Sequence, residues 1–588
     1  MIANYKVNQT YTATEKFLVE KLIELIFNKT IDSHRVRLNN PKWVLEEVKY
    51  VLRDWHTKKI KNFDRTVKPV ILEALELVEN DETLFHKKID KAYFHKLLGS
   101  SSEKNYLHLY HATNLVLDAN KNYLSHLFKL IEVEVIRINT LPVFNLNELE
   151  KLNALVDYLG TELVNHGFSK GFLYAKITWL FNDSTAKTFI DAYTNLRELG
   201  EREQEDFIVV FRLNKLGGRT RNIALKSQYE LSDSEKEIYI KINKKSADFF
   251  TRTGDFSYYL RIFLTGWDYL SVIEKAKKEL FTTMDLLHLG FPDNPFDFYK
   301  KCLVIGSNRR ELTNIHPISY IPDGHYKNKQ ELYDLLQGKI TKLYSNRLIQ
   351  RESIQKIISA FRHLRLGRDA DELEQKFINY WIGLEYIFSN YDISDNTITR
   401  LKDYFIHAHS IAYIKRNLTE FCLDIQRLKL DGEVPEFNPD LQFLKNEATF
   451  DHILQHYSTT YPLLAYRAAK YKNFLINKST LGRVISKHRT NLERHLTRCY
   501  RIRNEIVHDA AIHLNIESIT GNLKYYLTFI LNGLISYLDN TPVDINMNGY
   551  LSIEDYFILQ EIRYNSLENC KFKLEDLLEE ISATEIFG

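Results

Sequence analysis

The chain has 588 residues, too many for one ordinary hydrophobic core, so we expect about two to four domains. Apolar residues make up 44% and charged residues 27% of the sequence, a balance that excludes extensive disorder. The formal net charge of +2 excludes nucleic-acid binding through a global positive field and leaves only local basic patches.

The four cysteines are far apart and form no Cys-x-x-Cys pair, which argues against a cysteine zinc site and a disulfide framework. The first residues lack the basic-then-apolar layout of a signal peptide. No stretch reaches about 18 uncharged apolar residues, so we expect no membrane span. These features predict a cytoplasmic protein without a cysteine-based zinc site, and we expect no cofactor.

Residues 1–198 predict a mostly helical N-terminal region with a sensing or regulatory role. Apolar residues recur at helical spacing in residues 14–27, and residues 148–166 form another helix candidate. Asn40 is a suitable N-cap, because Pro41 follows it at the first helical position.

Residues 199–345 predict an α+β middle domain. Residues 206–213 and 258–264 are rich in β-forming residues, and residues 237–242 place isoleucine at every second position, so each predicts a strand. From Trp267 to about Leu289 the spacing is again helical. The run at residues 217–221 lacks the lysine–serine ending of a phosphate-binding loop, so we expect a turn there.

Residues 346–545 predict a helical domain. Its clearest helices cover residues 371–388, 487–508 and 516–538. Residues 546–588 predict a helical C-terminal tail that ends in an acidic amphipathic segment. The fold class is therefore mainly α with an α+β middle region: a helical N-terminal region, a mixed middle domain and a C-terminal helical bundle.

The segment Arg-Asn-Glu-Ile-Val-His at residues 503–508 carries the chemistry. An always-charged guanidinium near a titratable imidazole suits acid–base chemistry at a phosphodiester. Spacing alone is weak support, because an arginine followed by a histidine five to seven positions later also occurs elsewhere in the chain. Arg503 and His508 are distinguished by Asn504 directly after the arginine, by Asp509 after the histidine, and by an acidic helix upstream.

The stretch from Tyr500 to Asp509 resembles the Arg-Asn-x-x-x-His signature of HEPN domains, helical modules found in many prokaryotic toxins and antiviral ribonucleases. It is most similar to the Apea-like HEPN subgroup. The helical sequence Trp-Ile-Gly-Leu-Glu-Tyr-Ile-Phe at residues 381–388 resembles the acidic first helix of that subgroup, with Glu385 at its marked position. The resemblance covers about residues 350–545, and no motif is matched before them.

The resemblance implies a metal-independent endoribonuclease in which the ribose 2′-hydroxyl attacks the adjacent phosphate and leaves a 2′,3′-cyclic phosphate. His508 would be the general acid or base, Arg503 would stabilise phosphate charge, and Asn504 would orient the phosphate or His508. Glu505 and Asp509 would support them, although Asp509 also suits a helix cap. HEPN domains usually pair, so a homodimer is expected.

Helical geometry raises a difficulty, because residues five positions apart lie roughly 140° apart around a helix axis. Arg503 then projects from the apolar arc of its helix, whereas Asn504 and His508 share a face. Three solutions remain open: the helix breaks between 503 and 508, Arg503 acts across a dimer, or Arg503 pairs with Glu385. The last requires their charged groups to lie within about 6 Å.

Basic residues are dense along the motif helix, and we expect Arg494, Arg498 and Arg501 to bind the RNA backbone. A solvated face neutralised by acidic neighbours is the alternative. His407 and His409 are two positions apart, a spacing that does not converge on a metal in a helix, so we interpret them as surface residues.

The sequence therefore predicts an antiphage or abortive-infection effector that cleaves RNA, with tRNA as a candidate substrate and a phage-derived trigger as a candidate partner. The alternative is a non-catalytic HEPN module that binds RNA or a nucleotide, or that dimerises. In that case Arg503 and His508 are structural, and His508 is an ordinary histidine at a helix end.

Overall fold

The computed structural model describes residues 7–27, 39–79, 81–84, 90–182, 188–214, 229–251, 257–288, 297–307, 313–318, 330–370, 372–389, 397–476, 478–509, 516–540 and 549–568. The chain forms two compact units. Unit 1 contains Met1–Thr161, Phe181–Ala192 and Pro322–Gly588, and unit 2 contains Glu162–Leu180 and Tyr193–Ile321. Most of the predicted N-terminal region therefore shares one unit with the predicted HEPN range.

The N-terminal range is helical, as predicted. Thr12 begins the first helix with a capping box, in which its hydroxyl accepts the Glu15 N–H and the Glu15 carboxylate accepts the Thr12 N–H. Asn40 caps the next helix by accepting the Trp43 N–H at 2.7 Å, with Pro41 at the first position. The elements are α1 Ala13–Ile26, α3 Pro41–His56, η1 Phe63–Val67, α4 Lys68–Glu79, α5 Lys91–Gly99, α6 Tyr106–Ala119, α7 Tyr123–Asn139, η2 Leu146–Glu148, α8 Leu149–Asn165, α9 Lys170–Leu180 and α10 Phe189–Glu201.

Unit 2 is built on an antiparallel sheet with strand order β2-β1-β4-β5, and the short strand β3 also pairs with β1. In the register of the sheet, Val209 of β1 pairs with Ile262 of β2 and with Val304 of β4. The elements are β1 Glu205–Asn214, α12 Asp233–Ile240, α13 Lys244–Thr251, β2 Ser257–Gly266, α14 Ser271–His288, β3 Asp297–Phe298, β4 Lys301–Gly306 and β5 Asn314–Pro317.

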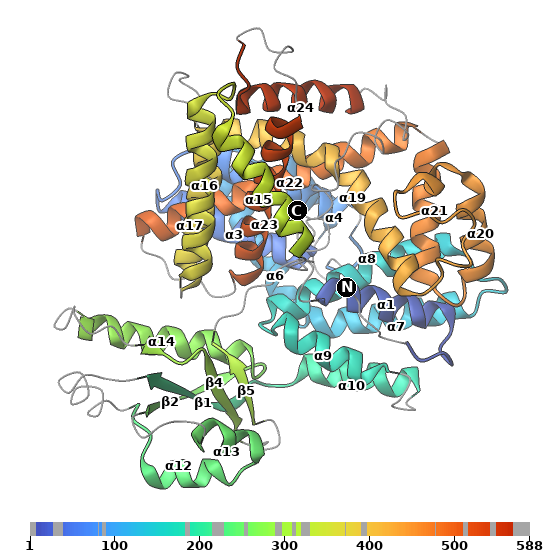
Figure 1. Ribbon diagram of the computed structural model, residues 1–588. Coiled ribbons are helices and arrows are strands. Elements are labelled where there is room, and N and C mark those ends of the chain that lie inside the picture. Colours follow the sequence, from blue (N-terminus) through green and yellow to red (C-terminus); the bar gives the residue numbers. More distant parts are fainter. Residues whose placement is uncertain are drawn as a thin grey trace. The chain divides into compact units, whose positions relative to one another are not determined.

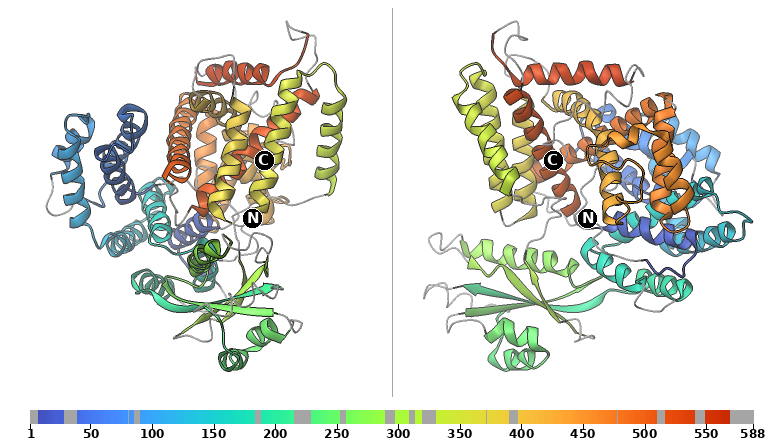
Figure 2. Two further views of the ribbon diagram at one scale, coloured as in Figure 1. Left: turned by 90° about the vertical axis from the view of Figure 1, so that its left-hand side faces the viewer. Right: turned by 45° about the vertical axis from the view of Figure 1, so that its right-hand side comes forward.

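Helices cover both faces of this sheet (Figures 1 and 2). Alternate residues of a strand point to opposite faces, so β4 sends Cys302 and Val304 into the core beneath α14. Leu303 and Ile305 enter the second core, which α12 and α13 close. Burial on both faces explains why these strands are almost continuously apolar.

The strand predicted at residues 237–242 is wrong, because this segment lies mostly in α12. Ser232 and Glu235 form a capping box that begins a helix, and this local signal overrides the alternating isoleucines. Of the α12 side chains only Tyr239 is buried, while Ile238 is exposed. The predicted strands at 206–213 and 258–264 are confirmed as β1 and β2, and residues 217–221 lie outside the described ranges.

The C-terminal range is helical. One glycine allows close packing around the helix that carries Glu385 of the candidate site. A Cβ added to Gly383 would lie 2.9 Å from Leu527 and 3.1 Å from His363, so the glycine allows α17 to lie against both α16 and α23. The elements are α15 Gln330–Ser345, α16 Arg351–Asp369, α17 Leu373–Phe388, α18 Thr397–Arg400, η5 Leu401–Phe405, α19 Ile406–Arg427, η6 Gln442–Lys445, α20 Glu447–Tyr457, α21 Pro462–Ile476, α22 Lys478–Asp509, α23 Glu517–Asn540 and α24 Ile553–Glu568.

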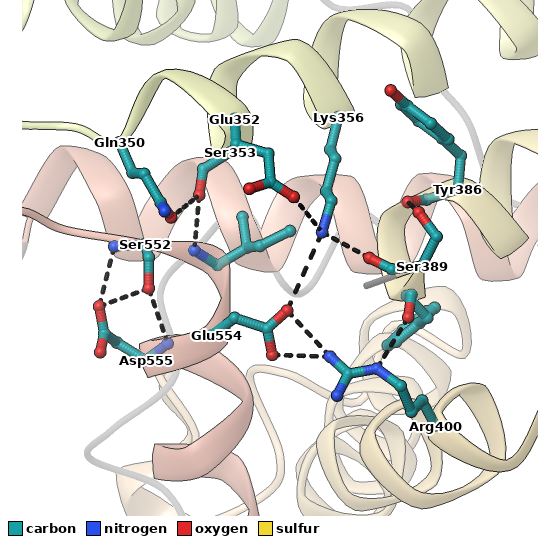
Figure 3. A network of polar contacts seen from close by, with 12 residues as sticks. Gln350, Glu352, Ser353, Lys356, Tyr386, Ser389, Arg400, Ser552, Glu554 and Asp555 are labelled. Atoms are coloured by element: carbon teal, nitrogen blue, oxygen red, sulfur yellow. Dashed lines mark hydrogen bonds and ion pairs between the residues drawn. The ribbon is translucent and has the colours of Figure 1, made fainter. Parts of the chain in front are cut away.

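Helix α24 belongs to the core of unit 1, although the sequence suggested a separate tail. The Phe557 ring is fully buried and stacks 4.8 Å from Phe388 of α17. Glu554 bridges two buried cations: it accepts two hydrogen bonds from Arg400 at 2.9 and 2.8 Å and lies 3.9 Å from Lys356 (Figure 3). The acidic segment predicted at residues 575–580 lies outside the described residues.

Buried polar contacts also join α1 to the C-terminal helices of unit 1. Arg467 of α21 forms ion pairs with Glu24 of α1 and with Asp424 of α19. The Glu20 carboxyl group accepts the backbone N–H of Leu463 at 3.1 Å. Glu24 is buried and the side chains of Arg467 and Asp424 are only 13% and 14% exposed, so the contact fixes one relative position of α1 and α21.

Candidate functional site

The motif residues lie in the last two turns of α22, which is one continuous helix from Lys478 to Asp509. A break between residues 503 and 508, one of the three expected solutions for Arg503, is therefore excluded. The continuous helix keeps Arg503 and His508 roughly 140° apart around its axis. Asn504 and His508 are four positions apart and share one face of the helix.

Arg503 is held by the neighbouring helix α17. Its Nη2 atom lies 3.8 Å from Oε2 of Glu385, and its Nη1 donates to Oδ1 of Asn504 at 3.1 Å. The same Glu385 oxygen accepts the indole N–H of Trp381 at 3.0 Å. The expected pairing of Glu385 with Arg503 is confirmed. About a quarter of each side chain is exposed, 25% for Arg503 and 28% for Glu385, so the pair remains accessible to a ligand.

His508 is exposed in the last turn of α22. Asp509 ends the helix, and its side chain lies outside the described part of the structure. Within one copy of the chain, the exposed imidazole of His508 and the guanidinium of Arg503 therefore lie on different faces of α22. Asn504 is the motif residue placed to act with either of them.

The three arginines expected to bind RNA instead face carboxylates from α3 and α4. Arg498 donates through Nε to both oxygens of Glu47, at 2.9 and 2.8 Å, and it also pairs with Glu73. Arg501 donates to Glu47 at 2.7 Å, and Arg494 lies 2.7 Å from Glu76. The arginine side chains are only 12–13% exposed, which corrects the expectation of an open basic patch.

Glu505 faces α3 rather than Arg503. Its side chain lies 3.6 Å from Nε of Arg501 and forms a hydrogen bond with the hydroxyl of Tyr50. Burial, together with the negative charges of Glu505 and Asp54, raises the pKa of Tyr50 to about 12. Glu505 is itself buried, so its contacts link the motif helix to the N-terminal helices.

The surface placement expected for His407 and His409 is wrong, because both are buried. His409 Nδ1 lies 3.0 Å from Nε2 of His488 on α22, and its Nε2 lies 3.3 Å from the Arg416 guanidinium. An arginine can only donate, so His409 Nε2 accepts and its Nδ1 donates to His488. The two imidazoles are therefore members of a core network between α19 and α22.

His407 has a different environment. Its ring stacks on Tyr564 of α24, with centroids 4.6 Å apart. Burial, and to a smaller extent the charge of Arg489, lowers the pKa of His407 to about 4. A further buried histidine, His495 on α22, lies 3.1 Å from the Tyr526 hydroxyl. Apolar residues surround His407 and His409 in the sequence, and that was the signal for burial that the spacing argument overlooked.

No protein-family model, curated protein or solved structure matches this chain. The HEPN resemblance therefore depends on the motif residues themselves and stays a prediction. Within the described ranges, no three His, Cys, Asp or Glu side chains come together in a group able to hold a metal ion. Among the helices of the described ranges, none has an apolar stretch long enough to cross a bilayer.

Proposed function

We propose that this chain is a HEPN-type endoribonuclease that cleaves RNA without a metal ion. The main support is the arrangement at the end of α22. Arg503 is accessible and held by Glu385, Asn504 is hydrogen-bonded to Arg503, and His508 is exposed one turn further along the helix. An oriented guanidinium and an exposed imidazole are the two groups that phosphodiester transesterification needs.

In the proposed reaction the ribose 2′-oxygen attacks the adjacent phosphorus, and the bond from phosphorus to the 5′-oxygen breaks. A base removes the 2′-hydroxyl proton, and an acid supplies a proton to the leaving 5′-oxygen. His508 takes one of these two roles, because imidazole exists in both protonation states near neutral pH. Arg503 stabilises the charge on the phosphate oxygens, and Asn504 orients the phosphate. The products are a 2′,3′-cyclic phosphate and a 5′-hydroxyl.

The active form in this proposal is a homodimer through the helical C-terminal part. Arg503 and His508 lie on different faces of one continuous helix, so a single copy does not present them together. Two copies related by a two-fold axis bring Arg503 of one copy towards His508 of the other, because such an interface places the same residues opposite each other.

The biological role in this proposal is defence by abortive infection, in which cleavage of cellular or phage RNA, tRNA included, halts growth. The N-terminal helices and the α+β unit sense the trigger. This role rests on the family resemblance, which is an analogy rather than a property of the site.

A non-catalytic HEPN module is the second candidate, and one observation favours it. The arginines expected to bind the RNA backbone are neutralised by carboxylates, as in a structural ion-pair network. In this case Arg503 and His508 stabilise the helical bundle. Overexpression separates the two functions, because a nuclease is toxic and loses its toxicity in His508→Ala, whereas a structural module shows no such difference.

The direct test incubates purified wild type and His508→Ala with total RNA in the presence of a chelator, followed by mapping of the cut ends. We expect cuts by wild type alone, leaving 2′,3′-cyclic phosphates. His456→Ala is a matched control, because His456 is also an exposed histidine in the last turn of a helix, α20. Equal cleavage by wild type and His508→Ala would contradict the assignment of His508.

A further inference from the structure

Four basic residues of α22 lie on one face of the helix, in a row that points towards His508. Lys487, Arg494, Arg498 and Arg501 are separated by seven, four and three positions, which keeps them on one face of a helix. The next two positions on the same face of the helix are Glu505 and His508. At a rise of 1.5 Å per residue this row and its extension span roughly 30 Å. We call the four basic residues the α22 stripe.

Helices α3 and α4 cover this stripe with carboxylates at matching spacing. Glu47 of α3 meets Arg498 and Arg501. From α4, Glu73 meets Arg498, and Glu76 meets Arg494 and lies 4.0 Å from Lys487. Further along α3, Tyr50 reaches Glu505. His508 lies beyond these contacts and is exposed, so the cover ends just before the candidate catalytic residue.

The covered groups have the chemistry that recognises a nucleic-acid backbone. An arginine guanidinium binds carboxylate and phosphate oxygens in the same forked geometry. The Arg498 contact with both oxygens of Glu47 is of this kind. A row of carboxylates that faces an arginine stripe occupies the positions that the phosphates of an extended strand would take.

The ion pairs between the stripe and its carboxylates can open at low free-energy cost if a phosphate replaces each carboxylate. The side chains of Glu47 and Glu73 are only 7% and 9% exposed, and that of Arg498 only 12%. Separating such a pair without replacement leaves a buried charge and is strongly unfavourable, whereas a phosphate that takes the place of the carboxylate keeps the arginine paired. In addition, the displaced carboxylates of α3 and α4 become solvated.

We propose that the α22 stripe is a binding track for the backbone of single-stranded RNA and that α3 and α4 cover it with Glu47, Glu73 and Glu76 in the resting protein. The proposal rests on the nuclease function proposed above and adds its regulation: strands reach His508 along the track only when the cover is displaced.

The test measures RNA binding without cleavage, in a His508→Ala background. The probe is a fluorescein-labelled single-stranded RNA of mixed sequence, and the variant is Glu47→Gln/Glu73→Gln/Glu76→Gln. Three freed arginines should make binding tighter at low salt. Binding should also depend more steeply on salt, because each phosphate contact on a single strand adds about 0.7 to the slope of log binding constant against log salt concentration. With three added contacts, raising the salt from about 50 to 200 mM should weaken RNA binding about twenty-fold more in the triple variant than in the protein without the three changes.

Two further variants keep the outcome interpretable. Glu134→Gln/Glu148→Gln removes two carboxylates that pair with Arg137 within the N-terminal helices and should leave RNA binding unchanged. Glu76→Gln alone alters the most exposed of the three carboxylates and should preserve folding while it frees Arg494. With the triple variant, Arg494→Gln/Arg498→Gln should abolish the gain in binding.

The outcomes separate this proposal from the nuclease proposal. Tighter, more salt-dependent binding by the triple variant supports the covered track, even if no form of the protein cleaves RNA. Unchanged binding by a folded triple variant, judged by circular dichroism, overturns it. If the triple variant does not fold, unchanged binding by the folded Glu76→Gln variant overturns it as well. Cleavage by wild type, with or without a gain in the triple variant, bears only on the nuclease function.

Discussion

The guanidinium of Arg503 lies 3.8 Å from the Glu385 carboxylate, and that carboxylate is fixed in turn by the indole N–H of Trp381. Two helices far apart in the sequence, α17 and α22, thereby orient the arginine of the motif. The pair is partly exposed, so it contributes only about 0–1 kcal/mol to stability. Its main effect is to position the guanidinium.

The first prediction concerns Glu385→Gln, which removes the charge but keeps an oxygen that can accept the Trp381 N–H. We expect RNA cleavage to fall about tenfold through kcat, because the guanidinium loses orientation for the transition state. The melting temperature should change little. Glu374→Gln on the same helix is the control. In a double-mutant cycle, Glu385→Gln should cost nothing further once Arg503 is alanine, and additive losses would contradict a positioning role.

The second prediction concerns the pH dependence of stability through Glu20. Burial raises the pKa of Glu20 to about 8, although the Leu463 N–H and the charges of Lys16 and Arg467 oppose it. The folded protein therefore keeps this proton where the unfolded chain has lost it, so stability falls as the pH rises from about 4.5 to about 8. Glu20→Gln removes this loss.

Urea unfolding of wild type and Glu20→Gln between pH 4 and pH 8 checks the sign. The two free energies of unfolding should change in parallel below about pH 4.5. Above it, the variant should gain on wild type by up to about 1.4 kcal/mol per pH unit. Curves that stay parallel to pH 8 would show that Glu20 is ionised in the folded protein.

The third prediction concerns the bridge in Figure 3. Lys356 and Arg400 have side chains only 4% and 5% exposed. Arg400 pairs with Glu554 of α24, whereas Lys356 also lies 3.1 Å from Glu352 and donates to the Ser389 carbonyl at 2.6 Å. Glu554→Ala leaves the buried Arg400 without this carboxylate, so we expect a loss of about 3–5 kcal/mol in the free energy of unfolding. The neighbouring Asp555→Ala removes the carboxylate that accepts the N–H and the hydroxyl of the N-cap residue Ser552, and it should cost about 1 kcal/mol. If chemical denaturation shows the same loss of unfolding free energy for Glu554→Ala and Asp555→Ala, the bridge does not have this stabilising role.

The sequence predicted much of this fold, because the decisive signals were local. Asn40 with Pro41 located the start of α3, and apolar spacing located α17 and α22. The apolar arc of α17 correctly placed Glu385 at its edge, near Arg503. Where two local signals competed, as at α12, the capping box was stronger than the alternation of isoleucines.

The partners of charged groups could not be predicted, because they depend on packing between segments hundreds of residues apart. Nothing in the sequence around Arg498 indicates that Glu47 and Glu73 neutralise it. The buried pair of His409 and His488 is likewise formed only when α19 packs on α22. Counting arginines along one helix therefore could not show that Arg494, Arg498 and Arg501 face carboxylates.

The final prediction tests whether the active site is shared between two copies. If Arg503 of one copy acts with His508 of its partner, Arg503→Ala and His508→Ala subunits should complement each other. In a mixed dimer one of the two sites then has both side chains intact. Random mixing makes half of the dimers mixed, so activity should recover to about a quarter of wild type.

The measurement mixes the two inactive proteins after partial unfolding and refolding, so that subunits exchange, and follows RNA cleavage. A mixture of His508→Ala with Asn504→Ala/His508→Ala is the control and should remain inactive, because no site can contain an intact His508. If the mixture of single variants is also inactive while size-exclusion chromatography shows dimers, both residues act within one subunit. In that case the roughly 140° separation along α22 must be bridged by the substrate itself.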